Sequence, residues 1–386
     1  MTDAPSRWDI FCKVIDNFGD AGVAWRLARA LAAGHGIDVT LWLDRPAALA
    51  RIEPGIAADA ALQRARGVTV RRWTDPPADT APAAVVVEAF GCGLPEGCLR
   101  AMAARTRAPH WFVLEYLSAE PWVDGAHGLA SPHPRLPLAR RFWFPGFTAA
   151  SGGLLRERGL LGERDAFVRD APAQAALWAS LRVPAPAPDE VRASIFCYPD
   201  APLPALLDAW AAGAQAVVCV VPDGVATAAL ERWSGAAAPR PGTAPLVRGP
   251  LSVHVIPFVA QDAYDRLLWA CDVNFVRGED SLVRAQWAAR PCVWQPYAQD
   301  AGAHLAKLAA FADRYTAGLA PAVGLAVRRL WQAWNRHPEA LPIGAAWLEF
   351  ERARPDLLQH GPAWAAQLAA LPEFAAGLVK AARNGV

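Results

Sequence analysis

The sequence predicts an α/β protein of two domains, each built on a mainly parallel sheet with helices on both faces. Segments typical of strands and helices alternate in both halves of the chain, which is the pattern of parallel α/β domains. The chain has 386 residues, more than one ordinary hydrophobic core accommodates. The two alternating series are separated by Val183-Pro184-Ala185-Pro186-Ala187-Pro188, a composition typical of a linker. Two such domains would form a cleft with ligands at facing strand ends.

The first series predicts one clear helix and five or more strands. A Pro- and Gly-rich stretch at residues 121–153 follows it and contains aromatic side chains such as Phe142, Trp143, Phe144 and Phe147, so we expect an ordered, functional loop there. The predicted elements are strands at residues 8–15, 38–43, 68–73, 84–90 and 110–115 and a helix at residues 21–33.

The second series begins after the linker and ends in helices. Helical patterns dominate from His304 onward, and the last, at residues 363–383, is long enough to reach back to the first domain. The predicted elements before His304 are strands at residues 192–198, 216–221, 252–258, 271–276 and 290–296 and helices at residues 203–212, 261–269 and 282–289.

The composition excludes several classes of protein. Hydrophobic residues make up 54% and charged residues 19%, which favours a packed globular chain over a disordered one. The formal net charge of +1 gives no global field to recruit nucleic acid or a membrane. Seven cysteines, with no C-x-x-C pair, lie mostly in apolar runs and suggest reduced thiols of a cytoplasmic protein. The N-terminus has no signal-peptide pattern, and no uncharged apolar run reaches the ~18–20 residues of a membrane span.

No metal site stands out in the sequence. There is no Asp-x-Asp pair and no H-E-x-x-H motif, and the eight histidines are dispersed. His127 and His133 share the long loop, but their spacing is weak evidence for a ligand pair.

The most informative stretch is Arg277-Gly278-Glu279-Asp280-Ser281, between an apolar run and a helical pattern. Open α/β sheets place ligands at such strand ends. Ser281 or Asp280 could cap the helix, whose N–H groups attract phosphate, and Arg277 adds a bidentate phosphate donor. The alternative is a capped helix with a surface ion pair. Upstream, Phe258 and Tyr264 could stack on a base or be ordinary core aromatics.

A second polar turn, at residues 16–22, follows the first predicted strand. It lacks the G-x-G-x-x-G fingerprint and is not a P-loop. Gly19 permits a positive φ there, and the structural alternative for Asp20 is an N-cap of the following helix. Asp16 and Asp20, four residues apart, indicate general-base work or recognition of a cation.

Taken together and in order, five segments resemble the elongation factor P arginine rhamnosyltransferase family, EarP, over most of the chain. They are Trp8-Asp9-Ile10-Phe11-Cys12-Lys13-Val14-Ile15-Asp16-Asn17-Phe18-Gly19-Asp20, Leu114-Glu115-Tyr116-Leu117-Ser118-Ala119-Glu120, Ser131-Pro132-His133-Pro134-Arg135-Leu136-Pro137, Phe144-Pro145-Gly146-Phe147-Thr148 and Arg277-Gly278-Glu279-Asp280-Ser281.

The resemblance implies a GT-B fold, in which two Rossmann-like domains face each other across a cleft and a C-terminal helix crosses back. The implied domains are residues 1–183 for the acceptor, residues 184–362 for the nucleotide sugar, and a returning helix at residues 363–386. The implied reaction is an inverting, metal-independent transfer of rhamnose from dTDP-β-L-rhamnose to one arginine of elongation factor P, which supports translation through polyproline stretches. No nucleic-acid or membrane partner is implied.

The resemblance also implies residue roles. Phe258 and Gln261 would hold the thymine, and Tyr198 and Tyr264 would wall the donor pocket. Catalysis would depend on the carboxylates of Asp16, Asp20 and Glu279. Arg277, Asp280 and Ser281 would bind the ribose or the diphosphate. Asn17 and Gly19 would add further contacts to the donor. Tyr264 departs from the phenylalanine of some relatives, but its ring face is kept.

Two other functions fit the same residues. The chain could be another GT-B enzyme with a different donor or acceptor, because fold alone does not fix substrates. It could also be a catalytically silent protein that docks on a translation factor. The carboxylates Asp16, Asp20 and Glu279 favour an enzyme with a cationic acceptor over both.

Overall fold

The structure is a computed structural model that describes residues 7–16, 18–74, 81–299 and 302–385. The chain divides into two compact units. Unit 1 comprises Met1–Arg158 and Leu368–Val386, and unit 2 comprises Gly159–Gln367. The α/β class predicted from the sequence is confirmed in both units, since each carries its own sheet with helices around it.

Unit 1 contains an eight-stranded sheet in the order β3-β4-β2-β1-β5-β6-β8-β7. The six strands from β4 to β8 are parallel, and β3 and β7 pair antiparallel at the two edges. The strands are β1 (Arg7–Cys12), β2 (Asp38–Leu43), β3 (Leu62–Ala65), β4 (Val68–Arg72), β5 (Val85–Ala89), β6 (His110–Leu114), β7 (Ala130–Pro132) and β8 (Ala139–Trp143).

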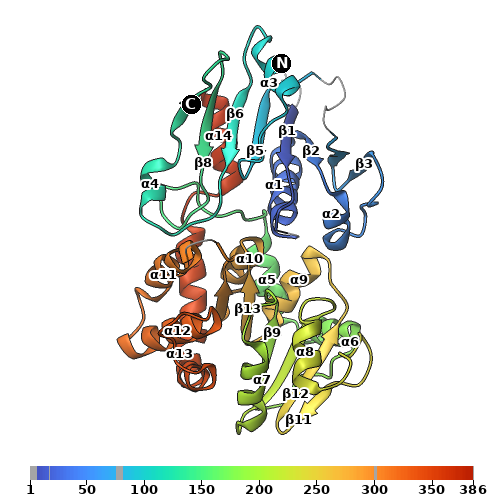
Figure 1. Cartoon of the computed structure of the whole chain (residues 1–386), viewed down its shortest axis with the longest axis vertical. Helices are drawn as coiled ribbons and strands as arrows, with labels where there is room; N and C mark the ends of the chain where they lie inside the picture. The colour runs from blue at the N-terminus through green and yellow to red at the C-terminus, as the bar shows by residue number, and fades with distance from the viewer. Residues whose placement is uncertain (1–6, 17, 75–80, 300–301, 386) are drawn as a thin grey trace. The chain divides into compact units, whose positions relative to one another are not determined.

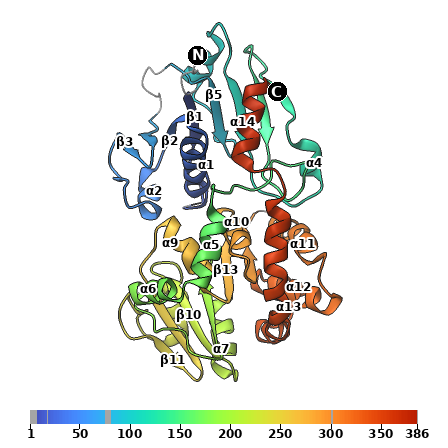
Figure 2. The same ribbon diagram turned by 180° about the vertical axis from the view of Figure 1, so that it is seen from behind.

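The helices of unit 1 cover both faces of its sheet. The strand order reverses between β1 and β5, so right-handed crossovers place the helices that follow these two strands on opposite faces. The last helix of the chain packs beside the first, as Figure 2 shows. The helices are α1 (Gly19–His35), α2 (Pro46–Ile52), α3 (Glu96–Ala103), α4 (Trp122–Ala126) and α14 (Phe374–Asn384).

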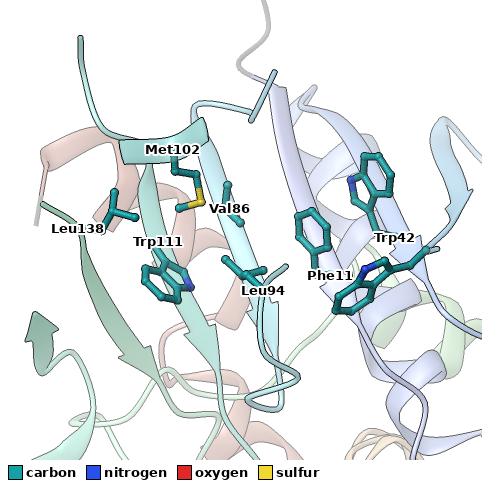
Figure 3. Packing of buried hydrophobic residues seen from close by; sticks show 8 residues of the cluster. Phe11, Trp42, Val86, Leu94, Met102, Trp111 and Leu138 are labelled. Carbon is teal, nitrogen blue, oxygen red and sulfur yellow. The ribbon is translucent and has the colours of Figure 1, made fainter. Parts of the chain in front are cut away.

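A tryptophan-rich cluster fills the space between this sheet and α3 (Figure 3). Trp42 stacks on Phe11 with ring centroids 5.4 Å apart. Two buried carboxylates serve the indoles, since Asp9 accepts from Trp42 Nε1 at 3.3 Å and Glu88 accepts from Trp111 Nε1 at 3.0 Å. Burial raises the pKa of Asp9. The indole N–H groups are thus satisfied inside the core.

Unit 2 contains a six-stranded sheet in the order β11-β12-β10-β9-β13-β14, in which only β11 is antiparallel. Its strands and helices are drawn in Figure 1. The strands are β9 (Glu190–Ile195), β10 (Ala216–Pro222), β11 (Leu246–Arg248), β12 (Leu251–Ile256), β13 (Val273–Arg277) and β14 (Cys292–Gln295). The helices are α5 (Leu160–Arg169), α6 (Ala171–Leu181), α7 (Leu203–Ala212), α8 (Thr227–Ser234), α9 (Gln261–Ala270), α10 (Asp280–Ala288), α11 (Ala303–Thr316), α12 (Pro321–Trp334) and α13 (Ile343–Ala369).

The first boundary between the units differs from the predicted one at residue 183. Helices α5 and α6 belong to unit 2 because they pack on α9, and Trp178, Leu181 and Val183 share a buried cluster with Val220 and others of unit 2. The Pro-Ala linker therefore lies inside unit 2 and precedes its first strand.

Two further predictions need correction. The stretch at residues 121–153 is more than a loop, because it contains α4, β7 and β8 and extends the sheet of unit 1. The helical pattern predicted at residues 363–383 is broken between α13 and α14. Glu373 supplies the reason, since its carboxylate caps a new helix by accepting from the N–H groups of Ala375 and Ala376. Residues from Leu368 onward belong to unit 1.

The cysteines that the structure describes are all free thiols, and five of them are buried. Among the described residues, no helix combines the length and the apolar character that a bilayer crossing requires.

Candidate functional site

The predicted site residues gather at one edge of each sheet. In unit 1 the strand order reverses between β1 and β5, and in unit 2 it reverses between β9 and β13. The carboxyl ends of strands beside such a reversal are the usual ligand sites of open α/β sheets. Asp16 and Asp20 follow β1, whereas Arg277 ends β13 and Tyr198 follows β9.

Backbone amides hold Asp20 in place. Asp20 lies in the first turn of α1 and is 3% exposed. Its Oδ2 accepts from the backbone N–H of Ile15 at 2.7 Å and of Asp16 at 2.9 Å. The structural alternative for Asp20, that of an N-cap, is wrong, because Phe18 occupies that position and Asp20 bonds the preceding turn instead. Amide donors stabilise a carboxylate in its charged form, which suits electrostatic or base chemistry. Asn17 lies outside the described residues.

Gly19 is important because it has no Cβ atom, which leaves room for the Asp16 side chain, and its backbone dihedrals are ordinary. It begins α1 and donates its N–H to the carbonyl oxygen of Asp16 at 2.7 Å. The expected positive φ is absent, since its φ falls outside the left-handed region. A Cβ at this position would lie 2.6 Å from Oδ2 of Asp16. Only a glycine therefore leaves the Asp16 carboxylate where it is, against the start of α1.

A strained aromatic lies at the neighbouring strand end. Phe90 directly follows β5 and has a φ of +58°, an unfavourable value for a bulky side chain. Its ring stacks on Tyr116, with centroids 4.7 Å apart, and Tyr116 is 36% exposed. Sequence reasoning did not select Phe90. The Gly91-x-Gly93 pattern after an apolar strand was the signal that could have found this tight turn.

Both histidines of the 121–153 stretch serve the backbone. Nδ1 of His127 accepts from the N–H of Phe144 at 3.1 Å, and burial lowers the pKa of this histidine. Nδ1 of His133 accepts from the N–H groups of Arg135 and Leu136 at 3.2 and 3.1 Å. These bonds need unprotonated Nδ1 atoms and order the stretch. Within the residues described, no group of three or more His, Cys, Asp or Glu side chains could hold a metal ion.

In unit 2, the guanidinium of Arg277 lies between two aromatic rings. Its centre is 4.5 Å from the ring of Phe196 and 4.7 Å from that of Tyr198. Nη1 donates to the carbonyl oxygen of Cys197 at 2.7 Å. The arginine is therefore fixed across the β9–β13 reversal, and this one bond uses only one of the five N–H donors of its guanidinium. Sequence reasoning also missed Phe196, although its place directly after β9 and two residues before Tyr198 was a usable signal.

The turn into α10 differs from the predicted capping. Gly278 has a φ of +62°, and Glu279 occupies the N-cap position with no side-chain bond to the helix. Ser281 instead accepts from the N–H of Arg277 at 3.1 Å and donates to the Arg277 carbonyl oxygen. Asp280 accepts from Nε2 of Gln261 at 3.2 Å. Neither Ser281 nor Asp280 caps the helix, so the structure corrects that expectation while bringing Gln261 to the turn.

Aromatic rings line the same edge of unit 2. The Phe196 ring lies 6.3 Å from that of Phe258 and 5.6 Å from that of Tyr264, while Tyr198 meets Tyr297 edge-on at 5.6 Å. Burial raises the pKa of Tyr264, so its hydroxyl stays neutral. The five predicted residues Tyr198, Phe258, Gln261, Tyr264 and Arg277 thus belong to one cluster, joined through Phe196 and Asp280.

Buried polar contacts stiffen this edge from behind. Asp265 of α9 and Arg284 of α10 form a bidentate ion pair at 2.8 and 2.7 Å, almost fully buried. Nε1 of Trp294 donates to the carbonyl oxygen of Gly278 at 2.7 Å. The two helices and the turn are therefore held in one geometry.

A cavity of about 810 Å³ lies in unit 1 at the other edge of the sheet. It is lined by strand starts such as Trp8 and His110 and by the helix-end residues His35 and Arg383. Basic side chains at helix C-termini complement the helix dipole. This structural role explains why basic residues such as Arg383 line the cavity. It lies away from the Asp16–Asp20 turn, because strand starts and strand ends are at opposite edges of a parallel sheet.

Comparisons with known proteins agree with one another. The family model described as "Elongation-Factor P (EF-P) rhamnosyltransferase EarP" matches residues 8–383. A protein-arginine rhamnosyltransferase of Pseudomonas putida is 47% identical over 99% of this chain and 100% of its own length. A second, from Pseudomonas aeruginosa, is 46% identical over 97% of this chain and 98% of its own.

A solved structure described as "Structural basis for EarP-mediated arginine glycosylation of translation elongation factor EF-P" superposes with a TM-score of 0.69 at 35% identity, covering 99% of this chain and 100% of that chain. A glycosyltransferase of kitacinnamycin superposes with a TM-score of 0.51 at 14% identity, over 98% of this chain and 99% of its own, and bears on the fold alone. The predicted GT-B fold class is confirmed by these likenesses and by the two α/β sheets.

Proposed function

This chain belongs to the EarP family of elongation factor P rhamnosyltransferases, and we propose that it transfers rhamnose from dTDP-β-L-rhamnose to one arginine side chain of elongation factor P. It is a glycosyltransferase by family membership. The observation that carries the proposal is the pairing of two opposite chemistries, a carboxylate turn after β1 and an arginine between aromatic rings at the end of β13.

The acidic turn of unit 1 suits a cationic acceptor. A guanidinium has a pKa above ~12 and a delocalised lone pair, so a carboxylate does not deprotonate it beforehand. Asp20, fixed by two backbone N–H groups, orients the guanidinium through a charge-assisted bond. As the bond forms between the arginine nitrogen and C1 of the sugar, the bond from C1 to the phosphate oxygen breaks and Asp20 takes the nitrogen proton. Asp16 adds negative potential beside it.

The cluster of unit 2 suits a nucleotide diphosphate. Phe258 and Gln261 hold the thymine, with Tyr198 and Tyr264 as walls of the pocket. Arg277, Asp280 and Ser281 hold the ribose or the diphosphate at the start of α10. The leaving dTDP departs as an anion stabilised by Arg277 and the helix dipole, so no general acid is needed. Glu279 completes the carboxylates on which turnover depends, and the family resemblance adds Gly19 and Asn17 to the residues that bind the donor.

The reaction needs no metal, because an arginine and a helix start supply the positive charge that a divalent cation would otherwise provide. Its acceptor is a translation factor, which places the enzyme in the cytoplasm and assigns it a role in translation through polyproline stretches. The N-terminal domain of elongation factor P, docked on unit 1, supplies the binding energy that a weak nucleophile requires.

The test is to mix the protein with elongation factor P and dTDP-β-L-rhamnose, with a chelator present, and to measure the intact mass of the acceptor. We expect a gain of one deoxyhexose on wild-type acceptor and none when its target arginine is replaced by lysine. Free arginine and short arginine peptides serve as acceptors without docking contacts, and we expect little transfer to them.

The same assay separates the alternatives. Transfer from another nucleotide sugar in a donor panel, with none from dTDP-rhamnose, would indicate a different glycosyltransferase. Binding of elongation factor P without any mass gain would indicate a silent docking protein and contradict the proposal.

A further inference from the structure

Lysine is rare in this chain, which makes each lysine informative. The sequence contains 38 lysine and arginine residues, of which only Lys13, Lys307 and Lys380 are lysine. Generic surface charge is therefore supplied by arginine here. Lysine differs from arginine in carrying a compact point charge rather than a planar fork. A position that keeps lysine against this composition is a candidate for a role that needs the compact ammonium.

Lys307 forms an ion pair with a residue already placed in the site. It lies on α11, and its Nζ is 2.9 Å from Oε1 of Glu279. The two side chains are only 14% and 16% exposed, so water screens the pair weakly. Most surface ion pairs contribute little, but an enclosed pair of this kind fixes both partners.

The pair determines where the Glu279 carboxylate lies. Glu279 occupies the N-cap position of α10, yet its side chain makes no bond to the helix N–H groups. Its carboxylate is paired instead with α11. A carboxylate over the start of α10 would occupy the place of an anionic ligand and repel it. Lysine at position 307 removes both obstacles, since it draws the carboxylate aside and neutralises its charge.

We propose that Lys307 is a positioning residue for the donor: by pairing with Glu279 it keeps the start of α10 open and electrically suited to the diphosphate of a nucleotide sugar. The inference rests on the proposed function, because it assumes a nucleotide diphosphate at this helix start. Lys307 acts through Glu279 and does not itself contact the diphosphate. A compact ammonium suits this task, since an arginine fork would extend further toward the phosphates.

The test is a binding cycle with dTDP as the probe, measured by calorimetry. The proteins are wild type, Lys307→Met, Glu279→Gln and the double variant. Lys380→Met is the matched control, because Lys380 is exposed on α14 of unit 1. Contacting charges couple by amounts that correspond to about tenfold effects. We expect Lys307→Met to weaken dTDP binding about tenfold, and the double variant to bind within about threefold of Glu279→Gln.

The rescue distinguishes positioning from other roles. If Lys307→Met weakens binding as much in the Glu279→Gln background as in wild type, Lys307 contacts the diphosphate itself and the positioning role is overturned. Unchanged dTDP binding in Lys307→Met, with the fold verified by its thermal unfolding, would also overturn it. If wild type fails to bind dTDP, the proposed function fails and this inference with it, a result distinct from an insensitive Lys307→Met.

Discussion

The carboxyl edges of the two sheets occupy equivalent places in two similar folds and carry opposite chemistry. At the β1 edge of unit 1, Asp16 and Asp20 lie in one turn. At the β13 edge of unit 2, Arg277 lies between two aromatic rings. The position of a site follows from the strand order, whereas the side chains after each strand decide its charge and its ligand.

The two edges also differ in what holds them. Asp20 is fixed by the backbone amides of Ile15 and Asp16, which persist when either side chain is changed to any residue but proline. Arg277 depends on the rings of Phe196 and Tyr198 as well as one carbonyl oxygen. We therefore expect the acidic edge to respond most strongly to changes in charge, and the aromatic edge to respond to the loss of packing as well as of charge.

The largest effect should come from Asp20→Asn. Asparagine can still accept from the two backbone N–H groups through its amide oxygen, so the turn keeps its shape while the charge is lost. We expect turnover on elongation factor P to fall by at least ~10²-fold, the scale of a general base. Intact-mass kinetics measure turnover, and dTDP calorimetry serves as the control that should change little. Turnover near that of wild type would remove Asp20 from catalysis.

The next largest effect should come from Arg277→Ala at the opposite edge. This change deletes the guanidinium that lies between Phe196 and Tyr198 and its charge-assisted bonds to a diphosphate. We expect dTDP binding to weaken by about 2–3 kcal/mol, in the range of hydrogen bonds to charged groups. Arg240→Ala, an exposed arginine of the same unit, is the matched control. Equal dTDP affinity in both variants would place the donor elsewhere.

Much of this comparison could be predicted from the sequence, because strand periodicity and polar turns are local. The run that became β13, the turn after it and the helix α10 are all visible in one short stretch. The same holds for β1, the acidic turn and α1. Such turns predict the positions of ligand residues without any knowledge of tertiary contacts.

What the sequence could not predict depends on partners far away in the chain. Phe196 joins the site through Arg277, and Lys307 joins it through Glu279, across 28 positions. The predicted caps at Asp20 and Ser281 failed for a related reason. Asp20 accepts from the N–H of Asp16 and Ser281 from that of Arg277, so each side chain bonds the preceding turn and not the helix N–H groups. Residue propensity alone does not decide between these two kinds of bond.

A smaller effect should come from Phe258→Ala. Its ring is half-buried and lies 6.3 Å from that of Phe196, just after β12, where the proposed function puts the thymine. We expect a loss of about 1–2 kcal/mol in dTDP affinity, in the lower part of the range for base–aromatic stacking. Phe258→Tyr should keep most of the affinity because the ring face survives. If the two variants bind dTDP equally, the thymine does not stack on this ring.

The smallest effect, and the one that separates geometry from charge, should come from Gly19→Ala. A Cβ at Gly19 would lie 2.6 Å from Oδ2 of Asp16, so the carboxylate must move while its charge remains. Gly34→Ala is the matched control, because a Cβ at Gly34, in the same helix, would meet nothing within 4 Å. Alanine is favoured over glycine in a helix by roughly 0.5–1 kcal/mol, so neither variant should lose stability.

We expect kcat to fall several-fold for Gly19→Ala only, which corresponds to a rise on the order of 1 kcal/mol in the activation barrier. Unfolding measurements and intact-mass kinetics on the pair decide the matter. Equal kcat in the two variants would mean that Asp16 acts through its long-range charge and that its exact placement against α1 is unimportant.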